Sequence, residues 1–248
     1  GGYVNEMVPR LVEALVGVNV VGTAAGGAHT VVWTDEGKAY SFGIGYFGRL
    51  GHGGEETELV PRRIKGALVG KRVVGVAAGD QHTVVMTDKG KAYSFGAGYY
   101  GLGHGGNDDE RAPRRIKGVL ERKRVVGVAA GNYHTVVWTD EGKAYSFGSG
   151  GYGKLGHGSK ENGRAPRRIK GVLERKRVVG VAAGGYHTVV WTDEGKAYSF
   201  GNGSFGQLGH GGEEGELVPR LIEGVLVGKS VVGVTAGSNH TVVWTGEG

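Results

Sequence analysis

The sequence predicts an all-β protein, a β-propeller of about five four-stranded blades, and three observations lead to this prediction. Glycine accounts for 53 of the 248 residues, roughly three times its average share of about 7%, which makes long helices improbable. Successive prolines lie 52 or 53 residues apart, at Pro9, Pro61, Pro113, Pro166 and Pro219. Each interval holds several short runs of β-branched and aromatic residues. Four short strands in about 53 residues are typical of a propeller blade, so residues 1–248 are expected to form one domain of five tandem repeats.

The third repeat illustrates the strands of one blade. Val125–Ala130 is the expected first strand and His134–Thr139 the second. A tight turn at Asp140-Glu141-Gly142 leads into a third strand at Lys143–Phe147. A fourth extended run is expected at Arg167–Leu173, just after Pro166. Proline suits this outer position because it has no N–H to donate to a sheet.

Side-chain alternation indicates how the blades pack. Tyr145 and Phe147 fall on one face of the third strand, whereas Ala144 and Ser146 fall on the other. The bulky face of one blade is therefore expected to pack on the small face of its neighbour. The small residues of Val125–Ala130 favour the innermost position, where blades converge and space is least.

The two ends of the sequence belong to one repeat. Val8–Leu11 aligns with Val60–Arg63, and Gly248 precedes the place of a third strand. One blade is therefore expected to be built from both termini and to lack one strand. An exposed blade edge can pair with another chain. The gap is therefore either filled by a strand from a protein partner or a second copy, or it reflects a shortened sequence.

Composition excludes several classes of protein. The chain has no cysteine, which excludes disulfides, thiolate metal sites and cysteine nucleophiles. It contains no stretch of 18 apolar residues and no signal-like segment, so neither a membrane span nor secretion is expected. These observations favour an intracellular location, cytoplasmic or nuclear.

Several repeated motifs have structural interpretations. Four Gly-x-Gly-x-x-Gly segments begin at Gly43, Gly96, Gly148 and Gly201, but no helix follows them, so no cofactor site is expected. A Gly-x-x-His motif opens the second strand of every repeat. Its histidines are expected to be structural, bonding to the backbone of their own blade rather than to a metal: His29, His82, His134, His187 and His240.

Catalysis is not expected, because active sites need unlike groups that converge at one place. Serine and histidine occur together in several copies of the repeat, and none of these pairs is distinct from the others. The sequence therefore nominates no catalytic residue.

Asymmetry between repeats indicates where partners could bind. The two residues before each recurring histidine vary most, and in a propeller this turn lies near the central axis. The turn is either a recognition surface or a loop under no selection. The candidate interaction residues are Asp80, Gln81, Asn132, Tyr133, Gly185, Tyr186, Ser238 and Asn239.

A basic segment forms a second candidate surface. The chain carries a net charge of +6, and the inner repeats read Pro-Arg-Arg-Ile-Lys where the terminal ones read Pro-Arg-Leu. The candidate residues are Arg114, Arg115, Lys117, Arg167, Arg168 and Lys170. Nearby acidic residues partly neutralise them. Binding to DNA or chromatin would depend on phosphate contacts and on salt.

The repeats resemble those of the regulator of chromosome condensation family. The resemblance rests on Gly184–His187, Gly195–Gly201 and the loop Gly206–Gly211, and it covers essentially the whole chain. It implies a β-propeller, usually of seven blades, and two activities: nucleotide exchange on a Ran-type GTPase with chromatin binding, and ultraviolet-B perception. The photoreceptors need clustered tryptophans, whereas here one tryptophan stands in the second strand of most repeats. The exchange factors carry a blade insertion and a basic tail that these repeats do not show.

The predicted function is a non-enzymatic, rigid scaffold for protein–protein interaction. One alternative is an exchange-factor-like or chromatin-binding propeller that uses its basic surface. A second alternative is an engineered symmetric repeat protein without a natural ligand. Residues 111–149 and 164–202 support the second alternative, because they differ at only two positions.

Overall fold

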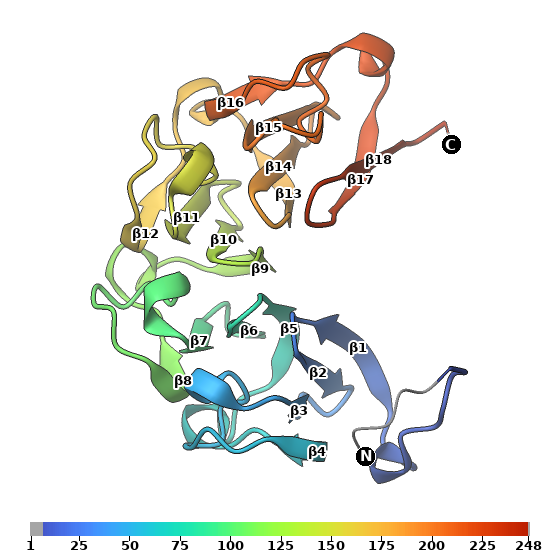
Figure 1. Cartoon of the computed structure of the whole chain (residues 1–248), viewed down its shortest axis with the longest axis vertical. Coiled ribbons are helices and arrows are strands. Elements are labelled where there is room, and N and C mark those ends of the chain that lie inside the picture. The colour runs from blue at the N-terminus through green and yellow to red at the C-terminus, as the bar shows by residue number, and fades with distance from the viewer. Residues whose placement is uncertain (1–6, 248) are drawn as a thin grey trace.

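The computed structural model describes residues 7–247, which form an arc of antiparallel sheets arranged as propeller blades (Figure 1). Four sheets have four strands, in the sequential order β1 to β4, β5 to β8, β9 to β12 and β13 to β16. The fifth sheet contains β17 and β18. The first strand of each sheet lies toward the centre of the arc, and the fourth lies at the outer rim. The predicted all-β propeller architecture is confirmed.

The strand bounds repeat from blade to blade. The first blade has β1 (Val20–Ala25), β2 (His29–Thr34), β3 (Ala39–Gly43) and β4 (Glu58–Arg63). The second has β5 (Val73–Ala78), β6 (His82–Thr87), β7 (Ala92–Gly96) and β8 (Glu110–Arg115). The third has β9 (Val125–Ala130), β10 (His134–Thr139), β11 (Ala144–Gly148) and β12 (Gly163–Arg168). The fourth has β13 (Val178–Ala183), β14 (His187–Thr192), β15 (Ala197–Gly201) and β16 (Glu216–Leu221). The fifth has β17 (Val231–Ala236) and β18 (Thr241–Thr245).

Single turns of 3₁₀ helix connect these strands. They are η1 (Glu13–Leu15), η2 (Tyr46–Gly48), η3 (Gly66–Leu68), η4 (Gly98–Tyr100), η5 (Gly118–Leu120), η6 (Gly151–Gly153), η7 (Gly171–Leu173) and η8 (Gly224–Leu226). None of the helices in the described part of the chain is long and apolar enough to cross a membrane.

The fourth strand was predicted in the wrong place. β12 begins at Gly163, so Pro166 lies inside the strand, and residues 169–173 form a connector that ends in η7. The proline is tolerated because β12 is the outermost strand and pairs with β11 on one side only. Ile169 and Leu173 instead turn inward and are buried beneath the next blade.

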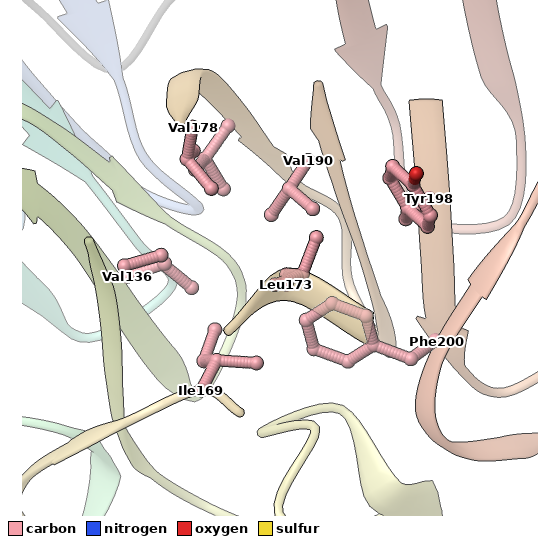
Figure 2. Packing of buried hydrophobic residues seen from close by; sticks show 9 residues of the cluster. Val136, Ile169, Leu173, Val178, Val190, Tyr198 and Phe200 are labelled. Atoms are coloured by element: carbon pink, nitrogen blue, oxygen red, sulfur yellow. The ribbon is translucent and has the colours of Figure 1, made fainter. Parts of the chain in front are cut away.

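The hydrophobic core lies between blades. Figure 2 shows Val136 of the third blade and the connector residues Ile169 and Leu173 against Tyr198 and Phe200 of the fourth. The same arrangement places Tyr145 and Phe147 in one cluster with Ala92 of the second blade. The predicted packing of a bulky face on a small face is therefore confirmed.

Tryptophan and glycine form a recurring pair in four of the five sheets. Trp138 on β10 lies opposite Gly127 on β9, and a Cβ at that glycine would overlap the indole ring. Trp33, Trp191 and Trp244 cover glycines in the same way. The first strand needs glycine there because the ring lies flat across its backbone.

The arc is open between the first and fifth blades (Figure 1). The expected blade built from both termini does not form within the described residues. Val8–Leu11, the expected outer strand, is irregular. The fifth sheet therefore has two strands rather than three.

Candidate functional site

The structure brings together, on one side of the arc, the two variable residues of each Gly-x-x-His motif. We call the surface formed by these turn residues the axial face. Backbone hydrogen bonds link successive turns. Gly27 N–H donates to Gly79 O over 3.1 Å, and Asp80 N–H donates to Asn132 O over 3.1 Å. Gly185 N–H donates to Gly237 O over 3.3 Å. The predicted interaction residues are thus neighbours in space.

The histidines of these motifs bond across blades, rather than to the backbone of their own blade as predicted. Nε2 of His82 lies 2.9 Å from Oγ1 of Thr135 in the next blade. The Thr135 hydroxyl donates its proton to Gly101 O, so the imidazole must be the donor in the first bond. The same pairs recur as His29–Thr83, His134–Thr188 and His187–Thr241.

Burial keeps these imidazoles neutral. Desolvation lowers the pKa of His82 to about 4 and that of His187 to about 4. Desolvation, together with the charge of Arg49, lowers the pKa of His29 to about 3. Their Nδ1 atoms are buried without a hydrogen-bond partner. Burying an unprotonated nitrogen in this way costs less free energy than burying a charged imidazolium. His240, at the end of the arc, is exposed.

The glycine of the motif makes room for this imidazole. A Cβ at Gly131 would overlap both the His134 ring and the carbonyl oxygen of Gly184 in the next blade. The Gly-x-x-His spacing therefore builds an inter-blade joint, and the two residues between are left free to vary.

Exposed aromatic side chains stand beside the axial turns, and sequence reasoning missed them. They lie in the loops after the third strands: Tyr46, Phe47, Tyr99, Tyr152 and Phe205. Tyr152 packs edge-on against Tyr186 of the axial turn, with 5.7 Å between ring centroids. The signal was present in the sequence, because the residue four after the first glycine of each Gly-x-Gly-x-x-Gly segment is Phe or Tyr.

Two of these aromatics have a strained backbone. Phe47 has φ of 62° and Tyr152 has φ of 65°, a region that non-glycine residues seldom adopt. Exposed side chains gain little from packing that could offset such strain, and strained residues cluster at functional sites.

Buried cations lie beneath this face at the position before the Leu-Gly-His motif. Arg49 donates from Nη1 to Asp80 O over 3.1 Å and from Nε to Tyr46 O over 3.0 Å. Lys154 donates to Ser149 Oγ over 3.0 Å, and burial lowers the pKa of its amine to about 8. The second repeat lacks this residue and the fourth has Gln207, so the charge beneath the face differs between blades.

Serine and histidine pair in four blades, but not as a catalytic dyad. Ser146 Oγ lies 3.0 Å from His157 Nε2 and 2.6 Å from Leu155 O. The hydroxyl proton goes to the carbonyl, so the imidazole donates to the serine and cannot accept its proton. Ser41, Ser94 and Ser199 repeat this geometry.

The predicted basic residues lie on the outer strands β8 and β12 and in the connectors that follow. Several are already engaged. Arg114 forms an ion pair with Glu110, while Arg115 and Arg168 donate to the carbonyl oxygens of Glu121 and Glu174. Arg167, Lys117 and Lys170 are exposed.

The fold and the face together define a class of protein: a β-propeller whose blades are joined by Gly-x-x-His motifs and which presents a variable, aromatic axial face. The chain belongs to the RCC1-like domain family, whose pattern it matches over residues 2–248. This finding confirms the resemblance drawn from the repeats.

Two relatives are similar to this chain over most of its length. Human E3 ubiquitin-protein ligase HERC2 is 42% identical over 240 residues, which are 96% of this chain and 5% of HERC2. Ultraviolet-B receptor UVR8 of Arabidopsis thaliana is 36% identical over 97% of this chain and 54% of the receptor. The chain thus spans about half the length of UVR8 and a small part of HERC2.

A solved structure shows the same fold. Prp20p of Saccharomyces cerevisiae is similar with a TM-score of 0.80 and 24% identity, covering 92% of this chain and 56% of Prp20p. That structure is described together with the binding of Prp20p to Gsp1p and histones.

Proposed function

We propose that this chain is a non-enzymatic interaction propeller that binds another protein through its axial face. The observation that carries this proposal is the meeting of variable turn residues and exposed aromatics on one side of the arc. Tyr152 and Tyr186 are in contact there, and Asp80 adjoins Asn132 through a backbone hydrogen bond. No two axial turns carry the same pair of variable residues, so the face differs from blade to blade.

The chemistry of the face suits a protein partner. Tyrosine, asparagine, serine and glycine are enriched in the antigen-binding loops of antibodies, where aromatic rings supply contact area at low entropic cost. Asp80 is the acidic residue of the axial turns, and Arg49 and Lys154 are buried beneath them. The face therefore favours a partner segment with polar and aromatic side chains rather than a strongly charged polymer.

Substitutions on this face provide the test. Tyr152→Ala combined with Tyr186→Ala removes the aromatic contact, and affinity capture with quantitative mass spectrometry compares the partners retained by the variant and by the unaltered chain. We expect the specific partners to fall at least tenfold. Val172→Ala combined with Val179→Ala is the control, since both valines are exposed but lie elsewhere on the blades. If the control loses the same partners and the tyrosine variant keeps them, the proposed face is wrong.

Self-association is a second candidate, favoured by the open end of the arc. Val242 and Trp244 on β18 are 50% and 47% exposed, whereas Val189, the counterpart of Val242 on β14, is fully buried. β18 pairs with β17 on one side and has no strand on its other side within the described residues. An unpaired apolar edge of this kind favours strand addition, and antiparallel pairing of β18 with β18 of a second copy would give a two-fold dimer.

The native mass tests this second candidate. We expect sedimentation to show a concentration-dependent dimer, and Val242→Lys to convert it to monomer because a charge at a strand edge opposes pairing. Val232→Lys on β17 is the matched control, since Val232 is 51% exposed but lies on the inner strand of the sheet, away from the free edge of β18. A monomer at every concentration would exclude the dimer.

A further inference from the structure

The outer rim of the third blade contains a small basic pocket. It has a volume of about 130 Å³, and His157, Arg167, Arg168, Lys170 and Val218 line it. None of its lining residues in the described part of the chain is acidic. A water molecule occupies about 30 Å³ in the liquid, so the pocket has room for a tetrahedral oxyanion.

One residue distinguishes this rim from those of the other complete blades. β4, β8 and β16 begin with Glu58, Glu110 and Glu216, whereas β12 begins with Gly163. Each glutamate forms an ion pair with the arginine four residues later: Arg62, Arg114 and Arg220. Arg167 is the corresponding arginine of β12, and it has no carboxylate to pair with at residue 163.

The neighbouring groups add to this positive field. Arg168 donates one N–H to Glu174 O over 2.9 Å, and its Nε is buried without a hydrogen-bond partner. Lys170 is exposed at the end of the same segment. His157 Nε2 is hydrogen-bonded to Ser146 Oγ at 3.0 Å. Desolvation, with a smaller contribution from the charge of Arg167, lowers the pKa of this histidine to about 4. The pocket therefore holds three cations beside a neutral imidazole.

We propose that this pocket binds a phosphate group, as inorganic phosphate or as the phosphate monoester of a phosphorylated protein segment. Guanidinium groups recognise phosphate oxygens through charge-assisted hydrogen bonds, and a dianion would replace the missing glutamate as the partner of Arg167. The site lies at the outer rim, away from the axial face, and it does not depend on the function proposed above.

The outer strands β8 and β12, which differ only in their first residue, allow a reciprocal test. Gly163→Glu restores the carboxylate that β4, β8 and β16 carry. The φ of Gly163 is not positive, and an added Cβ would meet Leu155 Cδ1 at 3.3 Å. Glu110→Gly removes the carboxylate from the second blade and frees Arg114. Binding of inorganic phosphate and of a phosphoserine peptide is measured by calorimetry at fixed ionic strength, and melting curves confirm that both variants fold.

We expect one phosphate site in the unaltered chain, at least tenfold weaker binding in Gly163→Glu, and a second site in Glu110→Gly. Arg167→Gln should weaken binding as Gly163→Glu does, whereas Arg114→Gln should not. Binding of the phosphopeptide at least tenfold tighter than inorganic phosphate, with no binding of the unphosphorylated peptide, identifies the protein-borne group as the ligand. Equal binding of the two identifies the free ion. Absence of binding, or binding that Gly163→Glu leaves unchanged, overturns the proposal.

Discussion

At the scale of single residues, the blades are joined by one imidazole and one hydroxyl. Thr135 accepts from His82 and donates to Gly101 O, and all three groups are buried. Thr135→Val keeps the shape but removes both bonds, leaving a buried donor and acceptor unsatisfied at a cost of about 1–3 kcal/mol each. We expect a lower urea midpoint and a loss of stability in this range.

Thr30→Val is the internal control for that substitution. Thr30 occupies the same position at the start of the arc, where no described blade supplies a histidine to it. Its replacement should change stability by less than about 0.5 kcal/mol. Equal losses for the two variants would contradict the role assigned to the inter-blade bond.

The neutral histidines make stability depend on pH. The folded pKa is about 3 for His29 and about 4 for His82 and His187, while an unfolded histidine titrates near 6.5. The unfolded chain therefore binds more protons, so stability is fully present above pH 6.5 and decreases as the pH falls toward 4. Each histidine contributes at most about 1.4 kcal/mol per pH unit. Urea titrations at pH 7 and pH 5 should show the decrease, and His82→Gln should make it shallower; a flat profile would refute it.

At the scale of secondary-structure elements, the tryptophan–glycine pair controls how the first two strands of a blade fit. A Cβ at Gly127 would overlap the Trp138 ring, whereas a Cβ at Gly75 meets the flexible end of Met86 at 3.1 Å. Gly127→Ala should therefore lower the melting temperature markedly, by overpacking worth about 1–3 kcal/mol, and Gly75→Ala should change it little.

The double variant Gly127→Ala with Trp138→Met gives the third blade the methionine that the second blade carries at this position. We expect it to recover part of the stability lost in Gly127→Ala alone, since methionine adapts its shape to small gaps. Thermal unfolding of the four proteins gives the coupling directly. Additive losses would show that the ring does not determine the need for glycine.

Much of each blade could be predicted from the sequence, because strand composition and repeat spacing are local signals. β9 and β10 have the predicted bounds. The outer strand was displaced by several residues because Ile169 and Leu173 look like strand residues but serve the inter-blade core. The bond from His82 to Thr135 spans 53 residues, and no pattern within one repeat indicates such a contact. The axial aromatics were missed for a similar reason, since their exposure depends on how neighbouring loops are arranged.

At the scale of the whole molecule, stability is distributed along the arc. Blades in the middle are covered on both faces, whereas those at the ends each have an uncovered face. Val73, Val125 and Val178 are 3% exposed, while Val20, at the same position on β1, is 38% exposed. In a repeat architecture stability is approximately a sum of units and neighbouring interfaces, so each end blade lacks one stabilising interface.

This distribution predicts the order in which the blades open. Amide hydrogen exchange under native conditions should be slowest in β6, β10 and β14, which lie in fully paired sheets, and fastest in β18, whose sheet has two strands. β1 should exchange faster than β9, although both are first strands, because local opening requires less free energy where fewer apolar contacts are broken. Thr188→Val, in the fourth blade, should speed exchange there and in β17 more than in β2. Uniform exchange across all blades would show instead that the arc unfolds as one cooperative unit.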